Sequence, residues 1–164
     1  MIIFDILFSE LGPSDELLGQ AMQEQGAVYL PYAFDIDPDK PSEAQEILGG
    51  VSESLRFAVA GTGHINIYVD KDGKVRRVPL MVHYMDKTWP SLGFLVAAKF
   101  LGKPVENLSG IPLEKDGSFW VNYPGSWTKA FRHFSYFDVL KAHAAKINKE
   151  TSWLDLSIFK DKIC

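Results

Sequence analysis

The start of the chain carries the pattern of a strand, a helix and a second strand in immediate succession. Residues 2–8 are apolar apart from Asp5, which is typical of a buried strand. In residues 16–25 apolar side chains recur at helical spacing, and Gly26 stands where a helix usually ends. Residues 27–32 are again apolar and predict a second buried strand. Strands joined in this way through a helix lie parallel, with a right-handed connection, so the pattern predicts an α/β fold.

Turn signals divide the rest of the chain into short strands and helices. Residues 65–69 and 75–84 flank Asp72-Gly73, a dipeptide that supplies the positive φ of tight turns, and they predict a β-hairpin. Residues 34–42 predict a surface loop and residues 43–60 a weak helix. Later elements are predicted as a helix ending near residue 101, a hairpin of residues 111–113 and 119–123, a helix over residues 136–147 and a strand from residue 162. Together they predict one α/β domain over residues 1–164, with a mixed, partly parallel sheet covered by helices.

Charge and composition exclude several classes of partner. The net charge of −4 argues against nucleic-acid binding and against adhesion to an anionic membrane surface, since both need a basic face. The single cysteine, Cys164, cannot form an internal disulfide or a cysteine metal site. No apolar run approaches the roughly 20 residues of a membrane-spanning helix, so this piece is expected to be soluble.

Known catalytic and cofactor motifs are absent from the sequence. It contains no nucleophile elbow, no phosphate-binding loop and no dinucleotide fingerprint. The four histidines do not pair at the spacing of a zinc site, and the acidic residues between positions 35 and 46 lack the glycine that a calcium loop needs. The sequence therefore predicts no cofactor, no metal site and no catalytic residue.

Asp5 and the consecutive arginines Arg76 and Arg77 are the most informative polar residues. A buried, unpaired carboxylate costs several kcal/mol, so Asp5 is expected to pair with one of the arginines or to lie at an exposed edge. In a strand the two arginines point to opposite faces, and either guanidinium could hold a carboxylate of the protein or of a ligand. The internal partner is the favoured of the two.

Candidate ligand-binding residues share a place at a predicted strand end or beside the predicted hairpin. Asn122 and Tyr123 follow a predicted strand, where they could line a pocket or simply anchor a loop. The full candidate set is Asp5, His64, Asn66, Arg76, Arg77, Asn122 and Tyr123.

Several short motifs follow one another in a recognisable order along the chain. They are residues 4–10 (FDILFSE), 63–66 (GHIN), 72–80 (DGKVRRVPL), 89–92 (WPSL) and 121–125 (VNYPG). Residues 135–140 and 159–163 match a closing helix and a final strand. In this ordered combination the chain resembles the CHASE type-2 family, the extracellular sensory domains associated with bacterial cyclases, histidine kinases and Ser/Thr kinases.

The resemblance implies an α/β sensor on the periplasmic side of the bacterial inner membrane. Transmembrane helices of the parent receptor would flank the domain and connect it to a cytoplasmic cyclase or kinase. Because a strand is expected to begin at the last three residues, the chain is interpreted as a truncated piece of such a receptor. The resemblance transfers no chemistry to individual residues, since ligands of the family are generally unidentified.

Three functions are consistent with the sequence. The first is a sensor domain that binds a small molecule or a protein signal without catalysis. The second is a module that only dimerises and positions the receptor. The third and weakest is a small α/β enzyme using Asp5, His64 and Arg76 as a polar cluster.

Overall fold

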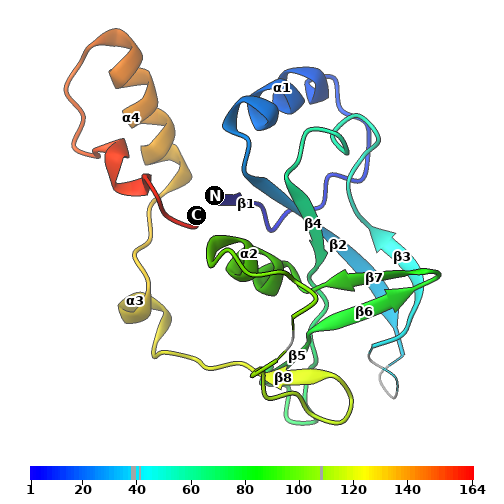
Figure 1. The fold of residues 1–164 in the computed structure, drawn as a ribbon. Helices are drawn as coiled ribbons and strands as arrows, with labels where there is room; N and C mark the ends of the chain where they lie inside the picture. Colours follow the sequence, from blue (N-terminus) through cyan, green and yellow to red (C-terminus); the bar gives the residue numbers. More distant parts are fainter. Residues whose placement is uncertain (38–39, 41, 108) are drawn as a thin grey trace. The chain divides into compact units, whose positions relative to one another are not determined.

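The computed structural model describes residues 1–37, 40, 42–107 and 109–164, apart from the side chain of Trp127. Its contacts divide the chain into two compact units, Met1–Val121 and Asn122–Cys164. Figure 1 shows the helices and strands in sequence order.

The predicted β-α-β pattern at the start of the chain is confirmed. Strand β1 (Ile2–Ile3) pairs in parallel with β2 (Val28–Ile36), and helix α1 (Asp15–Gln25) connects them. Gly26 ends α1 in the left-handed conformation, with its N–H donating to the carbonyl of Met22. This is the cap that the sequence predicted, because glycine adopts a positive φ without a steric cost.

Strand β1 is much shorter than predicted. It ends at Ile3, and Asp5 to Leu7 are exposed before Phe8 returns to the sheet as an isolated bridge with Val51. The rings of Phe4 and Phe8 pack edge to face at 5.7 Å, so the apolar run forms a bend around an aromatic contact instead of a continuous strand.

Strand β2 is the centre of a four-stranded mixed sheet (Figure 1). Its first half pairs in parallel with β4 (Gly61–His64), and its second half pairs antiparallel with β3 (Ala44–Gly49). The predicted loop over residues 34–42 is wrong for residues 34–36, which belong to β2, while its residues 38, 39 and 41 lie outside the described residues. The helix predicted over residues 43–60 is wrong, because β3 and turns occupy this segment. Whether such a segment forms a strand depends on its pairing with another strand, which its local helix propensity does not indicate.

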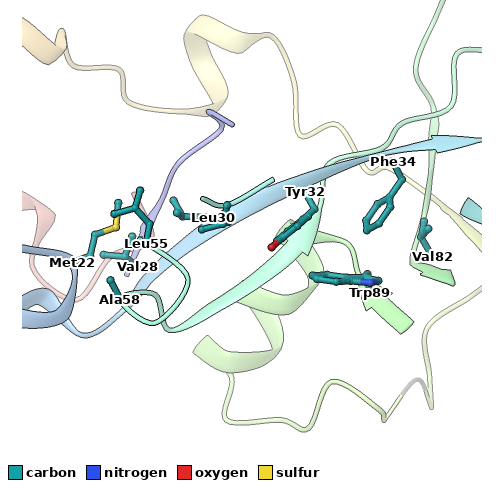
Figure 2. Packing of buried hydrophobic residues seen from close by; sticks show 10 residues of the cluster. Met22, Val28, Leu30, Tyr32, Phe34, Leu55, Ala58, Val82 and Trp89 are labelled. Carbon is teal, nitrogen blue, oxygen red and sulfur yellow. The ribbon is translucent and has the colours of Figure 1, made fainter. Parts of the chain in front are cut away.

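Alternate side chains of β2 enter two hydrophobic clusters, one on each face of the strand. On one face they pack with α1 and the segment after β3 (Figure 2). The members of this cluster are Met22, Val28, Leu30, Tyr32, Phe34, Val51, Leu55, Ala58, Val82 and Trp89. On the other face Tyr29 packs against Leu92, Leu95 and Val96 of helix α2 (Leu92–Phe100). Helices thus cover both faces of the mixed sheet, as the fold-class prediction required.

The turn predicted at Asp72-Gly73 is present, but the strands around it are arranged differently. The Asp70 N–H donates to the Lys74 carbonyl at 2.8 Å and the Tyr68 N–H to the Arg77 carbonyl at 3.3 Å, so the two arms of the hairpin meet. Residues 65–69 nevertheless form no strand. The strand that follows the turn, β5 (Arg77–Pro79), pairs antiparallel with β8 (Ser118–Trp120).

The predicted strand over residues 75–84 breaks at Leu80. Strands β6 (Met81–Tyr84) and β7 (Lys87–Pro90) form a hairpin of their own, which the sequence did not indicate. Its two-residue loop places Met85 at φ 52°, a conformation usually reserved for glycine or asparagine. The signal that normally identifies such a loop is therefore missing from the sequence.

The second unit contains three helices: α3 (Trp127–Ala130), α4 (Tyr136–Asn148) and the 3₁₀ helix η1 (Leu156–Phe159). Within this unit Ala142 and Leu154 are the buried apolar residues. The helical spacing of Phe137, Leu140 and Ala144 predicts that these side chains face inward from α4. This prediction is wrong, because Phe137 and Leu140 are 62% and 48% exposed and Ala144 is exposed as well. Helix η1 packs on the Ala142 side instead, and the strand predicted from residue 162 is absent.

Gly63 in β4 lies against the backbone at the start of α2, and we expect a methyl group there to destabilise the fold. A Cβ atom at position 63 would lie 2.7 Å from the Leu92 Cα and 2.8 Å from the Pro90 carbonyl oxygen. Since backbone atoms cannot rotate away, Gly63→Ala is expected to lower the free energy of unfolding by about 1–3 kcal/mol in urea denaturation.

Gly93→Ala is the matched control for this prediction. Gly93 lies in α2, close in sequence to the same contact, but a Cβ there meets nothing within 4 Å. Alanine favours a helix over glycine, so this variant is expected to gain about 0.5–1 kcal/mol. Equal destabilisation of both variants would contradict the close-approach explanation.

Candidate functional site

The predicted ligand-binding residues of the first unit differ in their surroundings. Asp5 is exposed after β1, whereas His64 is buried at the end of β4. Asn122 and Tyr123 are exposed and belong to the second unit. Within the described residues, no hydrogen bond or ion pair joins Asp5, His64 and Arg76, so the polar cluster considered for an enzyme is not assembled.

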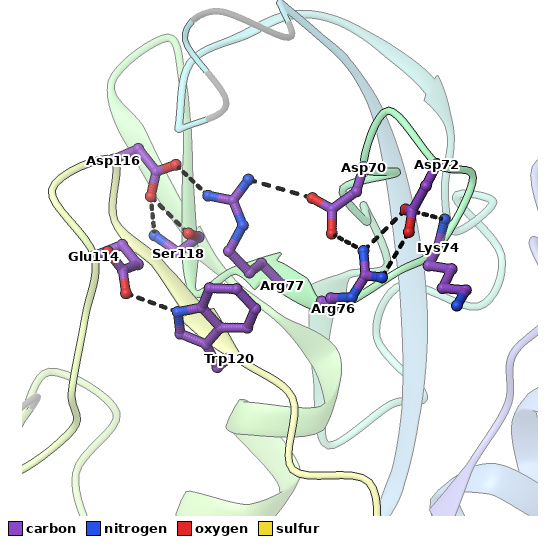
Figure 3. Close-up of polar contacts among 9 residues, drawn as sticks. All are labelled: Asp70, Asp72, Lys74, Arg76, Arg77, Glu114, Asp116, Ser118 and Trp120. Carbon is purple, nitrogen blue, oxygen red and sulfur yellow. Dashed lines mark hydrogen bonds and ion pairs between the residues drawn. The ribbon is translucent and has the colours of Figure 1, made fainter.

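Arg76 and Arg77 are held by carboxylates close to them (Figure 3). Arg76 Nη1 donates to Asp70 Oδ2 at 2.7 Å, and its Nη2 donates to Asp72 Oδ2 at 2.6 Å. Arg77 Nη1 donates to Asp116 Oδ2 at 3.2 Å, and its Nη2 reaches Asp70 Oδ1 at 3.5 Å. Asp70 therefore bridges the two arginines, and the predicted pairing of either arginine with Asp5 is wrong.

The choice of these partners follows from chain connectivity. Asp70 and Asp72 lie four to seven residues from the arginines, so closing the contact fixes only a short turn. Asp5 is free to stay in water at the exposed bend, where its charge carries no desolvation cost. The prediction that the arginines pair with carboxylates of the protein is thus confirmed, but the predicted carboxylate is the wrong one.

Arg77 also connects the turn to β8. Its guanidinium lies 5.4 Å from the ring centre of Tyr68 and 5.8 Å from that of Trp120. A hydrogen bond from Ser118, supported by the Arg77 charge, lowers the pKa of Asp116. Burial, followed by the negative charge of Asp116, raises the pKa of Tyr68 to about 12. The network leaves the main side-chain donors of both arginines occupied.

Asn66 makes a backbone clamp on β2. Its amide donates to the Phe34 carbonyl at 2.6 Å, and its side-chain oxygen accepts from the Phe34 N–H at 3.1 Å. Beyond the end of β4, the Asn66 side chain thus supplies the backbone hydrogen bonds of β2 that a neighbouring strand would otherwise supply. This contact occupies both ends of the Asn66 amide in holding the sheet.

His64 is the most deeply buried ionisable side chain among those predicted for the site, at 1% exposure. Neither ring nitrogen has a hydrogen-bond partner within the part of the chain that the structure describes. Burial lowers the pKa of His64 from 6.5 to about 4; the Leu80 backbone acts in the opposite direction but does not reach hydrogen-bond geometry. The imidazole is therefore neutral at pH 7 and is enclosed in the protein.

An open hollow of about 700 Å³ lies elsewhere in the first unit, beside β4 and β7. We call it the Tyr32–Trp89 hollow after its two aromatic rings, whose centres are 4.5 Å apart. Its polar side chains are Ser9, Arg56, Thr62 and Lys87, and none of its lining residues is acidic. The remaining lining residues are Ile47, Leu48, Gly49, Gly50, Val51, Val59 and Gly61.

A family model described as the CHASE2 domain matches residues 1–164, which is the whole chain. The chain belongs to the CHASE2 family. CHASE2 domains are sensory domains of bacterial membrane receptors, located on the extracellular or periplasmic side, and they are not catalytic domains. No curated protein and no solved structure gives a significant match to it.

In this CHASE2 domain, none of the helices within the described ranges is both long enough and apolar enough to cross a bilayer. A search of the same ranges finds no group of three or more His, Cys, Asp or Glu residues that could hold a metal ion.

The residues of the hollow were not predicted from the sequence of the CHASE2 domain. One signal for them was present: Lys87 and Trp89 are two residues apart in a strand, and such residues share a face. Arg56 and Ser9 lie in segments without regular structure, so their approach to the strands had no signature in the sequence.

Proposed function

We propose that this CHASE2 domain is the extracytoplasmic signal-sensing part of a bacterial transmembrane receptor that regulates a cytoplasmic cyclase or kinase. The observation that carries the proposal is the family match over the whole chain. A small-molecule or protein signal would favour one of two arrangements of the domain or of its homodimer, and the membrane helices of the parent receptor would transmit the change.

The structure supports this proposal in two ways. Arg76 and Arg77 are engaged in internal contacts, and they are not joined to Asp5 or His64 as a catalytic set, which suits a domain that binds without reacting. The Tyr32–Trp89 hollow offers an open, partly apolar surface with several polar groups, and this is the usual composition of a small-molecule site.

Cysteine labelling in cells expressing the complete gene product tests the location. Lys71→Cys, in a Cys164→Ser background, places a single thiol of the domain on the exposed turn after Asp70. A membrane-impermeant maleimide is expected to label this thiol in intact spheroplasts as completely as in lysed ones. Labelling only after lysis would overturn the extracytoplasmic location.

Leu30→Cys in the same background is the matched control. Leu30 has no exposed surface, so its thiol should resist the reagent in intact and lysed cells until a denaturant is added. The output is tested on the same membranes: replacing the domain by an unrelated exported domain should change cyclase or autokinase activity, and unchanged activity would contradict a sensory role.

A further inference from the structure

The Tyr32–Trp89 hollow combines positive charge with an aromatic surface. Lys87 Nζ lies 3.8 Å above the ring centre of Trp89, so the ammonium group is held at the wall of the hollow. Arg56 lines the same hollow and is exposed. Among the described residues, its side chain forms no hydrogen bond or ion pair.

Arg56 therefore differs from the two arginines that the sequence singled out. Arg76 and Arg77 have donors filled by carboxylates of the protein, whereas Arg56 lines a hollow that has no carboxylate among its lining residues. A guanidinium presents a planar pair of donors that matches a carboxylate. The hollow therefore has positively charged lining residues and no negative charge to balance them.

Another part of the wall of the hollow is shaped by glycine. A Cβ atom at Gly50 would lie 2.3 Å from Cε1 of Tyr32, so only glycine lets the backbone lie flat on this ring. The Gly50 N–H donates to the Ser9 hydroxyl oxygen at 3.0 Å, which orients that hydroxyl at the edge of the hollow. Close packing against Gly50 therefore holds the Tyr32 part of the hollow.

We propose that the Tyr32–Trp89 hollow binds a small organic carboxylate, with its charge at Arg56 and Lys87 and its apolar part against Tyr32 and Trp89. The hollow, at about 700 Å³, has the volume of a small-molecule site. This inference rests on the proposed sensory function, since it names the class of signal that the domain would receive. Neither cation belongs to the core, because both side chains are exposed.

Calorimetric titration of the chain with benzoate and with octanoate tests the proposal, with benzyl alcohol and inorganic phosphate as comparison probes. At least one of the two carboxylates is expected to bind saturably, and more tightly than either comparison probe. Arg56→Gln and Lys87→Gln should each raise the Kd of the carboxylate about tenfold or more, because each removes a charged hydrogen-bond donor. Lys87→Arg keeps the charge and should change the Kd by less than about threefold.

Lys71→Gln and Lys99→Gln are the matched controls, since both remove an exposed positive charge outside the hollow. They should leave the Kd unchanged, and the melting temperatures of all variants should show that they fold. Absence of saturable binding of both carboxylates would overturn the proposal. So would binding that survives in Arg56→Gln and Lys87→Gln, or binding of phosphate alone.

The outcome is separable from that of the proposed function. If Lys71→Cys is labelled from outside the cell but neither carboxylate binds, only the ligand class is wrong. If a carboxylate binds in the hollow but the label reacts only after lysis, the hollow is a binding site and the extracytoplasmic location is wrong.

Discussion

Phe34→Ala is expected to lower the free energy of unfolding by about 3–5 kcal/mol, the range for removing a fully buried aromatic ring. Phe34 is 2% exposed, and its ring centre lies 5.5 Å from that of Trp89 and 5.7 Å from that of Tyr84. These rings come from β2, β6 and β7, so alanine would leave a cavity where the large sheet meets the second hairpin (Figure 2). Urea denaturation followed by circular dichroism measures the loss.

Phe57→Ala removes the same side chain from the same unit but from its surface. Phe57 is 84% exposed, so this variant should change the free energy of unfolding by no more than about 0.5 kcal/mol. If both variants lost similar stability, the cluster around Phe34 would not be the core of the unit.

His64 is expected to make the domain less stable as the medium becomes mildly acidic. Its pKa is 6.5 in the unfolded chain and about 4 in the folded domain, because burial disfavours the imidazolium. A depressed folded pKa means that the unfolded chain takes up the proton first. The contribution is therefore complete above pH 6.5 and is lost progressively as the pH falls towards about 4. The shift corresponds to roughly 3 kcal/mol.

His64→Leu isolates this effect, because leucine fills a similar volume and does not titrate. Urea denaturation at intervals between pH 7 and pH 4 should show a steep loss of stability in the natural domain and a much shallower one in His64→Leu. Equal slopes would mean that other groups cause the loss. The range between pH 7 and pH 4 suits this test, since the pKa values of four carboxyl groups are lowered and these groups titrate below that range. They are Asp15, Asp72, Asp116 and Asp155.

Features encoded by neighbouring residues were predicted well from the sequence. Gly26 ends α1 as a left-handed cap, and the helix predicted to end near residue 101 ends at Phe100. The turn at Asp72-Gly73 forms, with Gly73 at φ 78°. In each case the physical cause lies in a few adjacent residues, as a positive φ or a helical spacing of apolar side chains.

Features that depend on distant partners were predicted poorly. The segment that forms β3 is rich in exposed side chains and was interpreted as a helix, yet its register with β2 makes it a strand. Arg77 pairs with Asp116, 39 residues away in sequence, and neither arginine pairs with Asp5. Arg56 and Lys87 meet at one hollow only because the chain after β3 returns beside β7.

Local patterns of apolar, glycine and capping residues were therefore sufficient for the α/β class, the parallel start of the sheet and the family. Strand pairing, the partners of the charged residues and the position of the hollow needed the folded chain. The physical reason is that turns and caps are stabilised by contacts a few residues apart, while pairing and burial depend on which distant segments exclude water from one another. No single stretch of the sequence specifies which distant segments pair or pack together.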